Sequence, residues 1–222
     1  MPPVSDLVRD SKLETKFRGG YTEHVYNVSG ATPRQRRVEK VERWERIKLL
    51  GTGAFGTVWL QKLVTENSEE KYRAVKKIRK VVQGHTPVDY DRELEVIAKF
   101  SHQKVRDRFL LSLYFLSPGT SLLFSHWPVE AHEKQYEMCF VRSFGWYDTD
   151  ESVFIAMEYF PLGDLQNYLS SPLPEKDAQQ ITSQILEGLL FMHDNGFAHR
   201  DLKPTVSLSS HLYTNTSLTL GI

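Results

Sequence analysis

Cysteine is almost absent from this sequence, and so is an excess of charge of either sign. Cys139 is the single cysteine among 222 residues, which excludes an intramolecular disulfide framework and gives no basis for a cysteine metal cluster. Lysine plus arginine equals aspartate plus glutamate at 28 each, so no overall field favours nucleic acid or an anionic membrane. The first twenty residues lack a long apolar stretch, so we expect no secretory signal and a cytoplasmic or nuclear location.

The remaining composition is that of a globular protein, with 40% hydrophobic and 25% charged residues, long enough for one large domain or two lobes. Residues 1–43 are polar and mixed, with Gly19-Gly20 and Pro33, and are predicted to be a poorly ordered leader. The basic residues at 34–37 are followed at once by glutamates, so they indicate a solvated segment rather than a nucleic-acid site.

The pattern of apolar residues predicts strands first and helices later. Strands are expected over 45–51, 57–64, 72–78, 137–147 and 151–160. One amphipathic helix is expected to start at Thr86-Pro87, with Leu94, Ile97 and Ala98 on its apolar face, and a second spans 173–196. This order favours an α+β lobe followed by a helical lobe.

Three glycines lie between the first two expected strands, as Gly51-x-Gly53-x-x-Gly56. In a dinucleotide-binding loop a helix follows the glycines, whereas here the chain continues as a strand. A glycine-rich hairpin lets backbone N–H groups approach phosphate oxygens without interference from Cβ atoms. Taken alone, the motif is equally compatible with a tight hairpin that binds nothing.

Four further residues give the glycines a chemical context. Lys76 lies on the third expected strand, where an ammonium can reach phosphates, and Glu93 lies on the following helix, where it can pair with Lys76. Asp201 can accept a hydroxyl proton, and Lys203, two residues on, can neutralise a transferring phosphate. Each residue alone is also explained as an ordinary surface charge.

Together these residues resemble the eukaryotic-type protein kinases, and His199-Arg200-Asp201-Leu202-Lys203-Pro204 resembles the serine/threonine branch. The resemblance covers residues 44 to about 204. It implies a protein kinase-like α+β fold with a complete β-rich N-lobe and hinge over 44–160 and an incomplete helical C-lobe that starts over 161–204.

The resemblance also implies roles for individual residues, with ATP and magnesium as cofactors and a protein serine or threonine as phosphate acceptor. The implied catalytic residues are Asp201 as base, Lys203 as phosphate clamp, and Lys76 with its partner Glu93. The implied nucleotide-binding residues are Gly51, Gly53, Gly56, Val58, Ala74, Lys76, Met157 as gatekeeper, Glu158 and Phe160 through their backbones, and Asp164 near the ribose. Met157 as a core residue and Asp164 as a helix cap are the simpler alternatives.

The sequence departs from the family pattern after Pro204. Val206 stands where the family has a magnesium-binding asparagine, and no Asp-Phe-Gly occurs, so no metal ligand is predicted. We therefore expect a truncated, inactive kinase domain with an atypical tail over 205–222. The alternative is a non-catalytic fragment of pseudokinase type that binds nucleotide or a protein partner.

An atypical insert, residues 105–135, separates the expected helix from the fourth strand. Residues 109–129 carry no charged side chain, but Pro118-Gly119 interrupts them and both flanks return to one small sheet, which disfavours a membrane span. A folded insert is one alternative. A translated intron is another, since Val105-Arg106 and Val206-Ser207 can both be encoded by splice-donor sequences. A mature transcript that retains both segments under every condition excludes this last hypothesis.

Overall fold

The structure is a computed structural model of the chain, and it describes residues 5–28, 38–53, 56–65, 70–81, 90–100 and 140–205. The chain divides into two compact units. Unit 1 comprises Met1–Lys99 and Ser143–Tyr159, and unit 2 comprises Phe100–Arg142 and Phe160–Ile222. The predicted insert, the Thr86-Pro87 helix start and residues 206–222 of the predicted tail lie outside the described residues.

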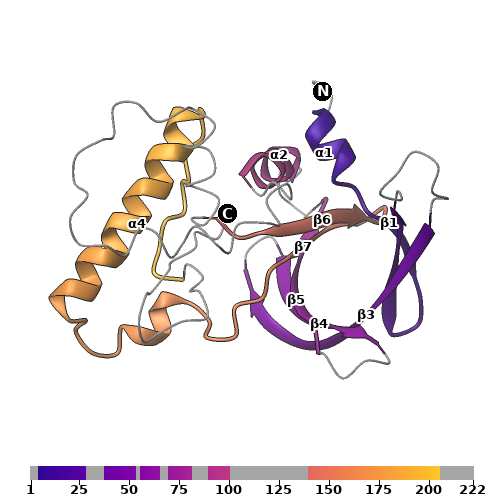
Figure 1. The fold of residues 1–222 in the computed structure, drawn as a ribbon, viewed down its shortest axis with the longest axis horizontal. Helices are drawn as coiled ribbons and strands as arrows, with labels where there is room; N and C mark the ends of the chain where they lie inside the picture. Colours follow the sequence, from indigo (N-terminus) through magenta and orange to yellow (C-terminus); the bar gives the residue numbers. More distant parts are fainter. Residues whose placement is uncertain are drawn as a thin grey trace. The chain divides into compact units, whose positions relative to one another are not determined.

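Unit 1 is built on a seven-stranded antiparallel sheet in the order β1-β2-β3-β4-β5-β7-β6 (Figure 1). Its strands are β1 (Glu14–Phe17), β2 (Tyr21–Val28), β3 (Val38–Thr52), β4 (Gly56–Val64), β5 (Tyr72–Arg79), β6 (Ser143–Asp148) and β7 (Ser152–Met157). The strands predicted over 45–51, 57–64, 72–78 and 151–160 are confirmed, although β7 is shorter than predicted. The strand predicted from residue 137 begins only at Ser143.

The expectation of a poorly ordered leader is wrong for residues 6–28. They form α1 (Asp6–Asp10), β1 and β2, and β2 pairs with β3 along its whole length, from Tyr21 opposite Glu45 to Val28 opposite Val38. The polar composition hid these strands because their stability comes from pairing with β3 rather than from local hydrophobicity. β3 accordingly begins at Val38, inside the predicted leader.

The N-terminal segment, residues 5–17, also closes the sheet on itself. Just before β1, the Leu13 N–H donates to the Trp146 carbonyl at 2.7 Å, and the Trp146 N–H donates to the Ser11 carbonyl at 3.1 Å. These bonds form a parallel bridge at Lys12 and Trp146, so the chain that enters β1 at one edge covers β6 at the other. Gly145, at φ +116°, permits this approach, since a Cβ there would lie 2.6 Å from the Ser11 carbonyl oxygen.

A charged side chain lies at the centre of the closed sheet. Arg73 is 0% exposed, its Nε donates to Gln61 Oε1 at 2.9 Å, and its guanidinium lies 4.1 Å from the Trp44 ring centroid. Its Nη2 is 2.7 Å from Nε2 of the buried His24, whose Nδ1 is 2.8 Å from the Thr15 hydroxyl. Burial first, and the adjacent Arg73 second, lower the pKa of His24 to about 3. Neutral His24 therefore accepts from Arg73 and donates to Thr15.

Two helices complete the described structure outside α1, apart from one short 3₁₀ segment. The helix α2 (Tyr90–Phe100), which belongs to unit 1 as far as Lys99, buries Leu94 and Ile97, as its predicted apolar face requires. In unit 2, α4 (Glu175–Asp194) confirms the helix predicted over 173–196. The described ranges contain no helix long and apolar enough to cross a bilayer.

Aromatic contacts hold the described part of unit 2 together. Phe100 stacks on Phe140 with ring centroids 5.0 Å apart and meets Phe191 of α4 edge-on at 5.6 Å. Phe197, just after α4, also contacts Phe100, at 5.3 Å. Because Phe197 begins the stretch that leads to Asp201, this cluster fixes the chain that carries the predicted catalytic base.

The buried neutral His24 makes stability depend on pH. Its pKa is below the unfolded value of 6.5, so as pH falls through 6.5 the unfolded state gains a proton that the folded state does not. We expect the free energy of unfolding to fall by about 2 kcal/mol between neutral pH and pH 5 from this residue alone. Urea denaturation at both values should show a smaller loss for His24→Gln than for wild type. The exposed His193→Gln is the control, and equal losses in all three proteins would contradict the assignment.

Candidate functional site

The pleat of β5 gives the sheet two chemically different faces. Arg73 and Val75 point to the closed interior, where Val75 packs with Tyr147, Phe154 and Ala156. Lys76 therefore points to the opposite face. It lies opposite Val58 of β4 and Ile155 of β7, so it occupies the middle of the sheet.

On that face Lys76 pairs with Glu93 of α2. The Lys76 Nζ donates to Glu93 Oε1 in a close charged contact. The lysine side chain is 32% exposed and the glutamate 22%, so the pair is partly shielded but an ammonium hydrogen can still reach a ligand. The structure thus brings together the two residues that the sequence pattern predicted to meet.

The register of the strands gathers other predicted residues around Lys76. Val58 is directly opposite it, and the buried Ala74 lies two residues before it on the same face. Met157 is half-buried and opposite Ala74 at the end of β7, followed by Glu158. Lys76, Glu93, Val58, Ala74 and Met157 therefore share one side of unit 1. Their roles in nucleotide binding stay predictions.

The glycines differ in what they permit. A Cβ on Gly56 would overlap the Lys77 carbonyl oxygen, so this glycine is required for the close approach of β4 to β5. A Cβ on Gly51 or Gly53 would meet no atom of the described residues within 4 Å. The Gly53 N–H is already donated to the Gly56 carbonyl at 2.9 Å, so it closes the hairpin and is not free for a phosphate.

In unit 2, Phe160 and Asp164 flank a tight turn. The Phe160 carbonyl accepts from the Gly163 N–H at 3.1 Å, and Gly163 has φ +77°. Asp164 lies at the N-terminus of a 3₁₀ helix, Leu165–Tyr168, but its side chain makes no capping bond. The buried Oδ1 of Asp164 has no hydrogen-bond partner among the described residues. The simpler alternative, a helix cap, therefore does not account for this carboxylate.

Asp201 and Lys203 lie together on an exposed loop of unit 2. The Lys203 Nζ donates to Asp201 Oδ2 at 2.6 Å, and the two side chains are 55% and 74% exposed. Arg200, immediately before, has φ +60°, which is rare for a residue other than glycine. Backbone strain of this kind concentrates at functional sites.

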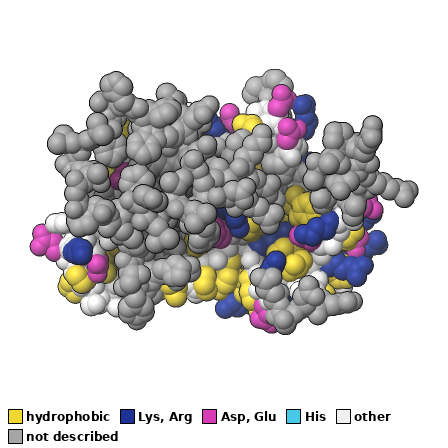
Figure 2. All heavy atoms as spheres, viewed as in Figure 1, with side chains coloured by type: hydrophobic (Ala, Val, Ile, Leu, Met, Phe, Trp, Pro, Cys, Tyr) yellow, Lys and Arg dark blue, Asp and Glu magenta, His cyan; other side chains and the backbone are white. Residues whose placement is uncertain are grey.

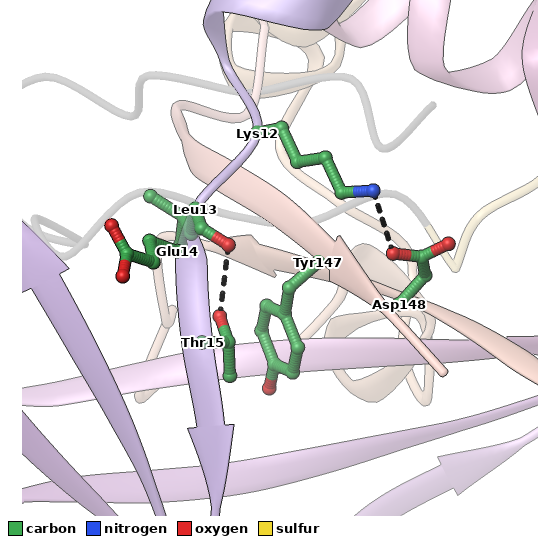
Figure 3. A pocket seen from close by; sticks show the side chains of 6 residues that line it. All are labelled: Lys12, Leu13, Glu14, Thr15, Tyr147 and Asp148. Carbon is green, nitrogen blue, oxygen red and sulfur yellow. Dashed lines mark hydrogen bonds and ion pairs between the residues drawn. The ribbon is translucent and has the colours of Figure 1, made fainter. Parts of the chain in front are cut away.

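A second ionic cluster was not predicted from the sequence. Asp148, at the end of β6, accepts from Lys12 through Oδ1 at 2.9 Å (Figure 3). It also accepts from Lys80 through Oδ2, at 2.9 Å. Partial burial would raise the pKa of Asp148, but the two hydrogen bonds hold it below its usual value. Lys80 follows the end of β5 by one residue and Lys12 precedes the start of β1 by two, and no local sequence signal joins positions 12, 80 and 148.

Comparison with known proteins identifies the class. The protein kinase domain family matches residues 129–211, so this chain has a protein kinase-like fold. The chain is 28% identical over 169 residues to the serine/threonine-protein kinase cds1 of Schizosaccharomyces pombe, which covers 72% of this chain and 28% of that protein. It is 30% identical over 177 residues to human Rho-associated protein kinase 1, covering 78% and 10%.

The calcium/calmodulin-dependent protein kinase type 1 of Caenorhabditis elegans is 27% identical over 165 residues, covering 73% of this chain and 37% of that protein. The chain belongs to the eukaryotic-type serine/threonine protein kinases. It spans between 10% and 37% of the length of these three relatives. The family match begins inside the predicted insert, at residue 129, and ends inside the predicted tail, at residue 211.

The glycines of the hairpin yield a direct test of this geometry. Gly56→Ala should lower the free energy of unfolding by about 3 kcal/mol, because its methyl group overlaps the β5 backbone. Gly53→Ala, which enters open space, should change it by less than about 0.5 kcal/mol. Urea denaturation followed by tryptophan fluorescence measures both, and similar effects of the two substitutions would contradict the register of β4 on β5.

Proposed function

We propose that unit 1 binds ATP, with Lys76 as the cation that holds the phosphates and Glu93 as the residue that holds Lys76. The family reaction to which this binding belongs is transfer of the γ-phosphoryl group of ATP to a protein serine or threonine hydroxyl. The Lys76–Glu93 contact is the observation on which the proposal rests. Its two members come from different elements of unit 1, β5 and α2.

The chemistry of the pair supports phosphate binding. An ammonium carries three hydrogens, so Lys76 can donate to Glu93 and to other acceptors such as phosphate oxygens. A lysine side chain has four rotatable bonds, and fixing one end against a carboxylate reduces the entropy that binding would otherwise cost. The partial exposure of Lys76 leaves its charge reachable by a ligand.

The surroundings of Lys76 also fit a nucleotide. Open space at Gly51 and Gly53 leaves room for a ligand against the hairpin backbone. Small and apolar side chains at Ala74 and Val58 suit the flat ring of adenine, with Met157 at the same edge. When bound, ATP supplies the phosphoryl group, and the residues of this chain hold and orient it.

In unit 2, the unsatisfied carboxylate oxygen of Asp164 supports its proposed contact with a ribose hydroxyl, which would give it a hydrogen-bond donor. Asp201 is proposed to accept the proton of the substrate hydroxyl, and Lys203 to balance phosphate charge. In the structure the Lys203 ammonium donates to Asp201 Oδ2.

Magnesium fits this sequence less well than ATP does. In the family two side chains hold the metal, and here Val206 replaces one and no Asp-Phe-Gly supplies the other within the 222 residues. A hydrocarbon side chain cannot coordinate a hard cation. This substitution favours a second candidate function, nucleotide or partner binding without phosphoryl transfer.

ATP binding is tested by replacing each of two neighbouring lysines, Lys76 and Lys77, in separate variants. Lys76→Met should weaken ATP binding at least about tenfold, because it removes a charge-assisted hydrogen bond. Lys77→Met should leave it unchanged, since Lys77 lies on the other face, with its Nζ 5.7 Å from the Phe154 ring centroid. Titration with ATP followed by thermal unfolding measures both. Wild type that shows no ATP-dependent shift, or equal losses in the two variants, would refute the proposal.

Phosphoryl transfer is tested separately. A protein of these 222 residues, supplied with labelled ATP, magnesium and a general protein substrate, should incorporate no label, because Val206 cannot bind the metal. If the wild-type protein incorporated label and Asp201→Asn did not, this expectation would be contradicted and the catalytic loop would be shown to work. Incorporation that persists in that variant would point to a contaminating kinase.

A further inference from the structure

The Asp148 cluster joins three separate parts of unit 1. Lys12 belongs to the N-terminal segment, Asp148 ends β6, and Lys80 follows β5. One carboxylate serves both ammonium groups, one on each oxygen, at 2.9 Å. Asp148 and Lys80 are 26% and 21% exposed, so their ion pair is shielded from solvent more than an ordinary surface pair.

The cluster lies on the same face of the sheet as Lys76. Asp148 is opposite Val153, which is opposite Ile78, and Ile78 lies two residues after Lys76 on β5. Residues directly opposite each other share a face, and so do residues two apart on one strand. Lys80 follows Ile78 by two residues. The Asp148 cluster and the Lys76–Glu93 pair are thus two charged groups on one face.

Lys80 is the point from which the chain leaves for α2. Its side chain is held by Asp148, and its backbone N–H donates to the Glu151 carbonyl at 2.9 Å. Its ammonium also lies 6.0 Å from the ring centroid of Tyr90, the first residue of α2. Glu93 follows three residues later, on the same first turn of the helix.

The N-terminal segment is fastened at the same place. Lys12 lies 4.8 Å from the Trp146 ring centroid, and the Trp146 Nε1–H donates to the Val8 carbonyl at 2.7 Å. Val8 of α1 is buried. Figure 1 shows α1 and α2 on the same side of β6. A pocket of about 360 Å³ beside the cluster is lined by Lys12, Leu13, Glu14, Thr15, Tyr147 and Asp148 (Figure 3).

We propose that Asp148 is a positioning residue for the Lys76–Glu93 pair, and that the N-terminal segment acts through it. With Lys12 and Lys80 both bound to Asp148, the start of α2 is held against the end of β6, and Glu93 is kept in reach of Lys76. Without the carboxylate, two ammonium groups face each other unpaired and repel. Lys80 then releases Tyr90, and the first turn of α2 gains freedom. The consequence for ATP affinity rests on the proposed function, whereas the placement of Glu93 does not.

The placement is tested without nucleotide, by the rate at which an amine-acylating reagent modifies Lys76, read by mass spectrometry. Asp148→Asn should raise that rate at least about fivefold, the lower end of typical coupling between sites. Asp148→Glu, which keeps the charge, should restore most of the protection. Asp150→Asn removes an exposed carboxylate from the adjacent turn and is the matched control. Lys77 in the same spectra is the internal standard.

A double-mutant cycle with Glu93→Gln separates positioning from general destabilisation. Glu93→Gln alone should expose Lys76, and adding Asp148→Asn should then change its labelling less than about twofold, because both substitutions release the same lysine. If the two substitutions raised the modification rate of Lys76 by independent factors that multiply, the proposal would be overturned. The same holds if Lys76 in Asp148→Asn were modified at the wild-type rate. If Asp148→Asn does not fold, Lys80→Met makes the same test, since it breaks the connection to Tyr90 and leaves Lys12 on Asp148.

ATP affinity is measured on the same variants. Weaker binding in Asp148→Asn but not in Asp150→Asn extends the proposal to function. Wild type that binds no ATP refutes the proposed function while the labelling results still decide whether Asp148 positions Glu93. Normal ATP affinity together with exposed Lys76 would overturn the functional part alone.

Discussion

The contact between Lys76 and Glu93 is the interaction on which the proposed chemistry of this protein depends. It joins the central part of a sheet to the helix that follows, and it sets a positive charge on a face where small and apolar side chains leave room for a nucleotide. Neither side chain has a fixed position by itself, because both are long and flexible. Their contact also depends on how α2 lies on β5, since the two residues belong to different elements. Every contact that holds α2 in its place over β5 therefore contributes to this site. These contacts act on the proposed ligand through the ammonium of Lys76, which Glu93 of α2 holds.

The same strand that offers Lys76 to a ligand on one face buries Arg73 on the other. A guanidinium with no exposed surface is expensive, and its cost is offset by Gln61, by neutral His24 and by the ring of Trp44 rather than by a direct carboxylate. The N-terminal segment closes the sheet around this interior. The strand order β1-β2-β3-β4-β5-β7-β6 thus gives a buried polar core on the face of β5 opposite to Lys76.

The face seen in Figure 2 carries side chains of both charges on its described part. In the view of Figure 2, Lys and Arg side chains lie beside acidic and apolar ones on the described part of the surface. Charge acts here through particular pairs. In the Asp148 cluster one carboxylate pairs with two lysines, so the cluster joins three segments. Through the proposed positioning role of Asp148, residues far from the hairpin, among them Lys12, would influence the position of Glu93. The relatives of this chain are named as protein kinases.

The sequence by itself determined the kinase family, the strands β3, β4, β5 and β7, the long helix α4 and the identity of Lys76 and Glu93 as partners. These depend on local patterns, since glycine spacing, strand alternation and helical periodicity are written in neighbouring residues. Only the tertiary structure decided that residues 6–28 form α1, β1 and β2. This segment is polar, and its backbone adopts this structure only because it pairs with β3 and β6. It alone joined Lys12, Lys80 and Asp148, whose attraction needs a closed sheet to bring charges 68 positions apart, Lys80 and Asp148, within 2.9 Å.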